Sequence, residues 1–265
     1  MYDFDIDPTN GDLVVLQAGS ILDRYTYDGN YKSSVRVPFA FQEFLLTDTG
    51  YIFYQDFSVI NQHLGAQSQK GLLITDKDFR LKETACHVKP TRWGKLGKDL
   101  FRVGDRVLVT RAFTDTIYSI DKNGISASVR IDYESNKLNP ELLYNQKHPG
   151  KIVRANSDKC RFSGDYSETE MHRCIMLDTN DWIILYQDKE SGNIQGGTRI
   201  FAETGVTPIV IFPNWCTKEY FVACINISKE KPLCTKIVAK EDSIKASKLT
   251  EESNPTLVFY KMKHF

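Results

Sequence analysis

The pattern of apolar and polar residues in the segment from Val107 to Tyr133 predicts three short strands joined by tight turns. Its first part, Val107–Ala112, has a period of two and several β-branched residues, which suits a pleated sheet and fits a helix poorly. A second apolar run leads into a tight turn at Asp121–Gly124, because Asn and Gly tolerate positive φ there. Ser126–Ile131 then returns as an outer strand. A single sheet of this kind cannot bury both of its faces, so it needs neighbouring copies.

Weaker versions of this unit recur along the chain, with turns rich in Asp, Asn and Gly between the strands. A repeated four-stranded unit is typical of a propeller, in which each sheet buries its faces against its neighbours. The 265 residues are therefore predicted to form a single all-β domain. It is a β-propeller of four-stranded antiparallel blades with short helical insertions. The five predicted blades span residues 2–37, 41–88, 99–133, 151–201 and 207–265, and the fourth ends in an outer strand over residues 194–201.

Several segments depart from the strand pattern. Residues 61–70 are polar without periodicity, which predicts a solvated loop. Asn139–Leu143 places an N-cap Asn before a Pro at the first helical position, and so predicts a short helix. Residues 240–252 are predicted to form a polar helix that ends before Pro255. No outer strand follows the final strand, Thr256–Lys261, so its edge is exposed unless something pairs with it.

Composition excludes some classes of protein. The formal net charge is +0 with 26% charged residues, whereas a nucleic-acid-binding domain usually carries a basic surplus. No apolar run approaches the roughly 20 residues that a transmembrane helix needs. The first residues already predict a strand and a turn, with no export signal or lipidation site. We therefore expect no nucleic-acid partner and no transmembrane segment.

The cysteines do not predict a metal site. They are Cys86, Cys160, Cys174, Cys216, Cys224 and Cys234. No pair has C-x-x-C spacing, so metal binding through thiolates is not expected. Cys224 lies in an apolar run and is predicted to be buried in a strand. A Cys160–Cys174 disulfide is an open alternative in an oxidising compartment.

Three stretches resemble a known family. Tyr2–Asp7 would open a blade, Tyr25–Asn30 would lie in its hairpin, and Glu252–Lys261 would form the closing strand. In these residues the chain resembles the six-bladed β-propeller lipoproteins of uncharacterised function found in gut Bacteroidetes, over essentially its whole length. The resemblance implies a location in the cell envelope or periplasm or on the cell surface. Its motifs are structural, so they imply no chemistry.

The N-terminal region departs from that family. Its members carry a signal peptide with a lipidated cysteine, then a first blade ending in a Gly-Pro-Gly-Glu-Tyr-like turn. This sequence resembles the family from just after that turn, which implies five of six blades. Two interpretations follow: a piece of a six-bladed protein, or a closed five-bladed ring. The unpaired edge of the last strand favours the first.

Candidate catalytic residues cluster in one stretch. Asp165, Glu168 and Glu170 lie close in sequence to His172. In an extended strand Glu168 and Glu170 would share a face at about 7 Å, where two carboxyl groups could flank a glycosidic bond at the channel mouth. The alternative is a solvated strand or loop with no catalytic role, which we favour. No catalytic residue is therefore assigned.

Metal and ligand-binding candidates are equally sparse. The five histidines show no H-x-x-x-H or H-E-x-x-H spacing, so no metal site is assigned and a zinc hydrolase is not expected. Ca²⁺ held by acidic residues from separate blades remains open, since spacing does not test it. Trp182 is predicted to be core. Trp93, beside Arg92, and Trp215 are the candidates for ligand contact, although turn tryptophans often pack between blades.

Two functional hypotheses follow. The first is a non-enzymatic binding or scaffold propeller of an exported, envelope-associated protein, whose ligand is an unknown protein, peptide or glycan. The second is a hydrolase or lyase of glycans or lactones that uses channel carboxylates, with or without Ca²⁺. An enzyme needs carboxylates from different blades to converge with perturbed pKa values, whereas a binding module does not. Composition favours the first, and no cofactor is predicted.

Overall fold

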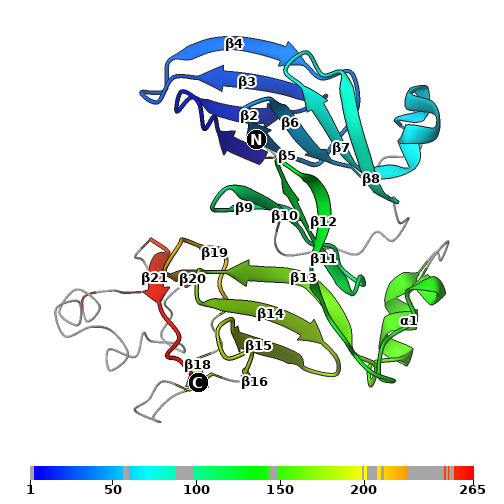
Figure 1. Cartoon of the computed structure of the whole chain (residues 1–265), viewed down its shortest axis with the longest axis vertical. Helices are drawn as coiled ribbons and strands as arrows, with labels where there is room; N and C mark the ends of the chain where they lie inside the picture. The colour runs from blue at the N-terminus through cyan, green and yellow to red at the C-terminus, as the bar shows by residue number, and fades with distance from the viewer. Residues whose placement is uncertain are drawn as a thin grey trace.

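The computed structural model describes residues 3–55, 60–87, 98–143, 148–198, 200–201, 208–209, 212–225, 248, 250 and 254–265. In these residues the protein is an all-β propeller, as the sequence predicted. Four blades are four-stranded antiparallel sheets whose strands pair in chain order, and the fifth contains three strands in the described part. Figure 1 shows the blades following one another around an arc.

The strand bounds are as follows. The first blade contains β1 (Asp3–Ile6), β2 (Leu13–Gln17), β3 (Ile21–Tyr25) and β4 (Tyr31–Arg36). The second contains β5 (Glu43–Thr47), β6 (Gly50–Tyr54), β7 (Lys70–Asp76) and β8 (Leu81–His87). The third contains β9 (Leu100–Val103), β10 (Arg106–Val109), β11 (Thr116–Asp121) and β12 (Gly124–Arg130). The fourth contains β13 (Arg161–Glu168), β14 (His172–Asp178), β15 (Trp182–Asp188) and β16 (Ile194–Gly197), and the fifth β19 (Trp215–Cys216), β20 (Phe221–Ile225) and β21 (Thr256–Tyr260).

The first strand of each blade, here called the inner strand, lies nearest to the neighbouring blades. β1 contacts β5, β5 contacts β9, and β13 contacts β19. The ring of Phe101 in β9 lies 5.9 Å from that of Tyr166 in β13, which links the third and fourth blades. The inner strands therefore form the inside of the arc, and their side chains decide what the channel presents.

The hydrophobic core consists of layers between consecutive blades. Between the first two blades, Phe53 is fully buried, and its ring centroid lies 4.6 Å from that of Phe41 and 5.1 Å from that of Phe39. Further layers join the second blade to the third, the third to the fourth and the fourth to the fifth. Period-two strands supply these layers, because alternate side chains point to opposite faces of each sheet.

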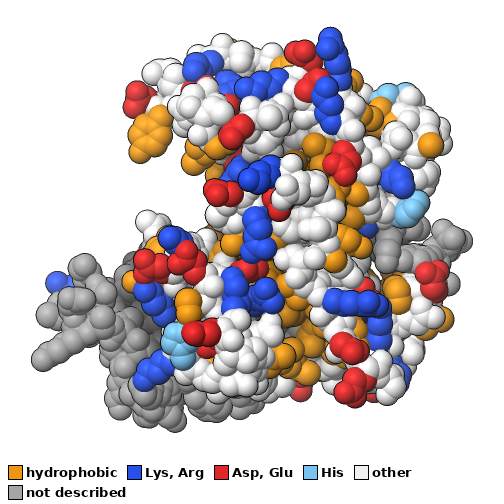
Figure 2. Space-filling view, viewed as in Figure 1, with side chains coloured by type: hydrophobic (Ala, Val, Ile, Leu, Met, Phe, Trp, Pro, Cys, Tyr) orange, Lys and Arg blue, Asp and Glu red, His pale blue; other side chains and the backbone are white. Residues whose placement is uncertain are grey.

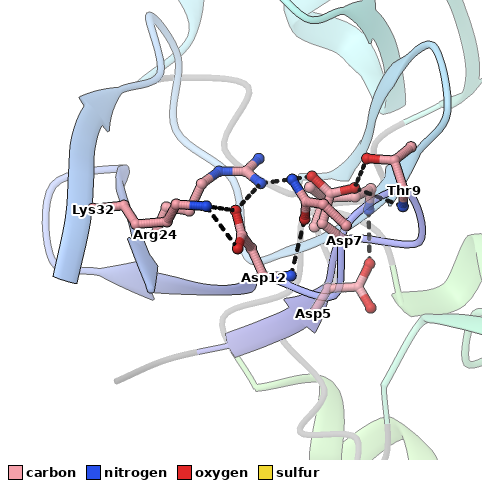
Figure 3. Close-up of polar contacts among 8 residues, drawn as sticks. Asp5, Asp7, Thr9, Asp12, Arg24 and Lys32 are labelled. Atoms are coloured by element: carbon pink, nitrogen blue, oxygen red, sulfur yellow. Dashed lines mark hydrogen bonds and ion pairs between the residues drawn. The ribbon is translucent and has the colours of Figure 1, made fainter. Parts of the chain in front are cut away.

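A polar network closes one end of the first blade (Figure 3). Arg24 Nη1 donates to Asp7 Oδ2 at 2.6 Å and to Asp12 Oδ2 at 3.2 Å, and Lys32 Nζ lies 2.8 Å from Asp12 Oδ2. The hydroxyl of Thr9 donates to Asp7 Oδ1 at 2.6 Å. The predicted turn between β1 and β2 thus carries two buried carboxylates, and both are paired.

The irregular segments are more helical than the sequence suggested. Residues 61–70, predicted to be a solvated loop, contain the 3-10 helix η1 (Gln62–Gln69), while Asn61 is buried and its amide donates to Gln55 Oε1 at 2.8 Å. The short helix expected after Asn139 is the 3-10 helix η2 (Pro140–Leu143). The helix α1 (Pro149–Ala155) was not predicted. Most of the predicted helix at 240–252 lies outside the described residues.

The end of the fourth blade also differs from the expectation of one outer strand over residues 194–201. The pairing of β15 with β16 ends at Ile184 and Gly197. Residues 200–201 instead form β17 (Ile200–Phe201), which pairs with β18 (Pro208–Ile209) in a separate two-stranded sheet. The predicted strand is therefore divided because its two halves have different partners.

Two burial predictions were wrong, and the disulfide is not formed. Trp182 is 52% exposed, because it pairs with Asp178 at the very end of the β14–β15 ladder rather than in the inter-blade layer. Cys224 is exposed on the face of β20 opposite the fourth blade. Cys160 and Cys174 are both free thiols.

The outward faces of the first and fifth blades expose apolar side chains. In β1 of the first blade, Phe4 is 47% exposed and Ile6 is 54% exposed. Asp3, on the opposite side of the same strand and facing the second blade, is buried. In the fifth blade Leu257 and Phe259 are 52% and 56% exposed. Figure 2 shows a notch on the side of the molecule between these two blades. We call these two surfaces the outward faces.

Candidate functional site

Carboxylates on the inner strands bind backbone amides of the next blade. Asp3 accepts a hydrogen bond from the N–H of Phe44 at 3.0 Å, and Asp5 accepts one from the N–H of Leu46 at 2.7 Å. Glu43 does the same one blade further on, with the N–H groups of Asp99 and Leu100 at 2.7 and 2.9 Å. Inner strands of different blades do not form a ladder with each other, so these amides need acceptors. The carboxylates supply them.

Cations cover the same carboxylates. Lys98 Nζ lies 2.5 Å from Asp3 Oδ1, and Arg102 Nη2 lies 3.4 Å from Asp5 Oδ2. Figure 2 shows Lys and Arg side chains gathered along the middle of this face. The inside of the arc therefore presents partly exposed cations, with the acidic groups beneath them.

Glu168, a candidate from the sequence, is the most enclosed of these carboxylates. It ends β13, and its side chain is 0% exposed. Arg106 Nη2 and Lys189 Nζ donate to its Oε1 at 2.8 and 2.7 Å, and the hydroxyl of Tyr166 donates to its Oε2 at 2.5 Å. Arg173 Nε lies 3.9 Å from the same Oε2. Three strands and the β15–β16 turn thus converge on one carboxylate.

The electrostatics keep Glu168 ionised. Burial alone would raise its pKa, but the hydrogen bonds from Lys189 and Tyr166 and the nearby positive charges outweigh burial, so the pKa of Glu168 is lowered. Burial and the adjacent carboxylate raise the pKa of Tyr166. A general acid at neutral pH needs a carboxyl group with a raised pKa, and Glu168 is shifted the opposite way.

Glu170 does not join Glu168. It lies beyond the end of β13, its side chain is 55% exposed, and its Oε1 is 3.0 Å from Lys218 Nζ. The expectation that both carboxylates share one face assumed that the strand continues, whereas the chain turns at Thr169, whose N–H donates to the carbonyl of His172. The two carboxylates therefore differ in burial and in partners.

The remaining candidates lie apart from Glu168. Trp215 opens β19 and is 55% exposed, which leaves it able to contact a ligand. Arg92 and Trp93 lie outside the described residues, so their role stays a prediction. His172 is the first residue of β14 and is buried beside Asp188 and His264. Each of these three side chains offers one atom that could bind a metal, and the three atoms lie within 4.8 Å of one another. This group is the one cluster of three His, Cys, Asp or Glu side chains close enough to hold a metal among the residues described.

Sequence reasoning missed the partners of the candidates. Arg106 is 62 residues from Glu168, and His264 is 76 residues from Asp188. Lys189 follows the strand β15 and gave no distinguishing signal, since a Lys at a turn is usually solvated. A prediction of blade order would have placed Arg106 beside β13, but not its contact with a particular carboxylate.

Taken together, the fold and this site define a β-propeller whose inner-strand carboxylates join blades and balance buried charge. The chain belongs to the family described as Domain of unknown function (DUF4934), whose model matches residues 1–261. No curated protein matches the sequence.

Among solved structures, the chain is similar to a crystal structure of a Bacteroides fragilis protein named "Putative exported protein". Identity is 16% and the TM-score 0.75, over 99% of this chain and 77% of that one. At this identity the likeness shows the fold alone. BamB from Moraxella catarrhalis matches with a TM-score of 0.47 and 11% identity, over 83% of this chain and 57% of that one. The Pan2 WD40 domain of Neurospora crassa matches with a TM-score of 0.42 and 12% identity, over 84% of this chain and 55% of that one.

In the part of the chain that the structure describes, no helix has the length and apolar character required to cross a membrane.

Proposed function

We propose that this protein is a non-enzymatic binding or scaffold propeller, part of an exported, envelope-associated protein. The observation that carries the proposal is the use of the inner-strand carboxylates. Asp3, Asp5 and Glu43 accept hydrogen bonds from backbone amides, and Glu168 is buried under cations. A glycosidase-type site needs two carboxyl groups that reach the substrate with pKa values pushed apart. Carboxylates committed to holding blades together fit a scaffold better.

Export is supported by the name of the Bacteroides fragilis protein and by the resemblance to envelope lipoproteins.

The outward faces support a protein ligand that adds a sixth sheet between them. In the fifth blade, Val222 pairs with Phe259 and Cys224 with Leu257, so these four side chains share the face turned away from the fourth blade. Phe4 and Ile6 share the corresponding face of the first blade, because they alternate with Asp3 and Asp5, which bind the second blade. Among the described residues, each junction between consecutive blades contains a buried apolar layer. A further antiparallel sheet, supplied by the partner protein and seated between these faces, would complete six blades.

The ligand of the outward faces is therefore a protein. A glycan site would expose aromatic rings among amide and hydroxyl groups, whereas Leu257 and Phe259 present aliphatic and aromatic surface on one strand. Exposed apolar patches of this kind mark protein contacts.

A photocrosslinking experiment tests the proposal. A photoreactive amino acid replaces Phe259 in one variant and the equally exposed Trp182, which lies at the end of a different blade, in the matched control. After irradiation of cells that produce the protein, we expect a discrete protein adduct from position 259 and none from position 182. Equal adducts from both positions, or none from either, would refute the proposed contact surface. Turnover of an oligosaccharide or lactone that is lost in Glu168→Gln would refute the non-enzymatic assignment.

A further inference from the structure

Three potential metal ligands meet at the junction of the fourth and fifth blades. His172 is the first residue of β14, Asp188 is the last residue of β15, and the two are paired across the ladder. His264 follows β21 and reaches the same place from the fifth blade. Its Nδ1 lies 2.9 Å from Asp188 Oδ2, and His172 Nε2 lies 3.7 Å from the same oxygen.

The carboxylate of Asp188 is oriented by its own turn. Its Oδ1 accepts the N–H groups of Glu190 and Ser191 at 2.9 and 3.1 Å, which leaves Oδ2 directed at the two histidines. These two backbone hydrogen bonds fix the orientation of the carboxylate. In metal sites, a carboxylate ligand is commonly held in place by hydrogen bonds from groups that do not themselves touch the metal.

His172 presents an unused nitrogen to the cluster. The residue is 4% exposed, and its Nε2 has no hydrogen-bond partner in the described structure. An imidazole nitrogen without a hydrogen-bond partner can offer its lone pair to a metal ion when the ring carries its proton on the other nitrogen. An unpartnered buried nitrogen is costly unless something binds it.

The segment that carries His264 is fastened to the same turn. Ser191 Oγ and Asn193 Nδ2 donate to the carbonyl of Phe265 at 3.1 and 3.0 Å. The ring of Phe265 stacks at 5.7 Å on that of His172. The side chain of His264 itself is 62% exposed, so it can move by the small distance that coordination requires.

We propose that His172 Nε2, Asp188 Oδ2 and His264 Nδ1 bind one divalent transition-metal ion, best matched by Zn²⁺. Two imidazoles and one carboxylate suit Zn²⁺ and its neighbours, whereas Ca²⁺ and Mg²⁺ prefer sites made of oxygen. Zinc bonds of about 2.0–2.2 Å would draw the three atoms, now within 4.8 Å, closer together. The ion would tie the segment after β21 to the fourth blade and keep a fourth position for water or for a partner's side chain.

Calorimetry with Zn²⁺ tests this site. The full chain, without a polyhistidine tag and stripped with a chelator, is titrated with ZnCl₂ in buffer containing excess Ca²⁺ and Mg²⁺. We expect one ion per chain, a raised Tm on binding, and affinity at least about tenfold weaker in His264→Ala and in Asp188→Asn. His264 is largely exposed, so its replacement does not threaten the fold. His63→Ala is the matched control, because His63 is an exposed histidine of the second blade.

Cobalt gives a second readout. Co²⁺ bound at this site should show visible absorption of a nitrogen- and oxygen-ligated ion, which Zn²⁺ displaces and which His264→Ala lacks. No Zn²⁺ binding by the wild-type chain would overturn the inference. Equal binding by wild type and His264→Ala would also overturn it, since the ion would then lie elsewhere. The outcome is independent of the crosslinking test, because the site lies on the opposite side of the fifth blade from the outward face.

Discussion

Replacing Glu168 with Gln removes the negative charge beneath the cations of the fourth blade. Gln has nearly the same shape, so packing is kept while the partner of Arg106 and Lys189 becomes neutral. The side-chain NH₂ group of Gln is a hydrogen-bond donor, and it would face Arg106, Lys189 or Tyr166, which are donors themselves. The change therefore isolates the electrostatic role of this carboxylate.

The structure sets the size of the effect. Breaking a buried ion pair by removing one partner costs about 3–5 kcal/mol. Here the side chains of Arg106 and Lys189 are 35% and 23% exposed, so water can rehydrate them in part. Gln also keeps one acceptor oxygen. We therefore expect Glu168→Gln to lower the free energy of unfolding by about 2–3 kcal/mol at pH 7.

The effect must depend on pH with a definite sign. The pKa of Glu168 is lower in the folded state than in the unfolded state. Its contribution to the free energy of unfolding is therefore complete above the unfolded pKa, about 4.3, and is lost as the pH falls through the folded pKa. The difference between wild type and Glu168→Gln should therefore be full at pH 7 and shrink below pH ~4.

Urea unfolding, followed by tryptophan fluorescence and circular dichroism, measures the loss of unfolding free energy at pH 7 and its change with pH. Glu170→Gln is the control, because this carboxylate is exposed and its pair with Lys218 should contribute less than about 1 kcal/mol. A loss below about 0.5 kcal/mol for Glu168→Gln at pH 7, or a loss no greater than that of Glu170→Gln, would show that the buried carboxylate is not a structural element.

Two further substitutions test the fold. Phe53→Ala empties a fully buried site between the first two blades and should cost about 3–5 kcal/mol in urea unfolding, whereas Phe259→Ala on the outward face should cost under about 1 kcal/mol. Similar losses for the two would contradict the assigned core. Gly50→Ala would place a methyl group 2.0 Å from the carbonyl oxygen of Thr75, so β6 and β7 must separate. A clear fall in Tm is expected by calorimetry, and an unchanged Tm would contradict this close approach.

Part of the candidate site was readable from the sequence. The stretch around Glu168 and His172 could be singled out because acidic groups and a histidine are concentrated there. Their environments could not be predicted, because burial of Glu168 depends on Arg106 from another blade, and Glu170 is exposed only because the chain turns at Thr169. Histidine spacing did not bring out the cluster of His172, Asp188 and His264, because the two histidines come from different blades.

The sequence by itself determined what is local. Period-two alternation defined the strands, and Asn-Gly and Asp-rich turns set their ends, as at Asp121 and Gly124, which pair across the β11–β12 turn. Tertiary structure decided which face of each strand another blade covers. Trp182 and Cys224 looked like core residues and are exposed, because alternation tells which side chains share a face but not what lies against it. That contact forms between segments far apart in sequence, and it also brings His264 to Asp188.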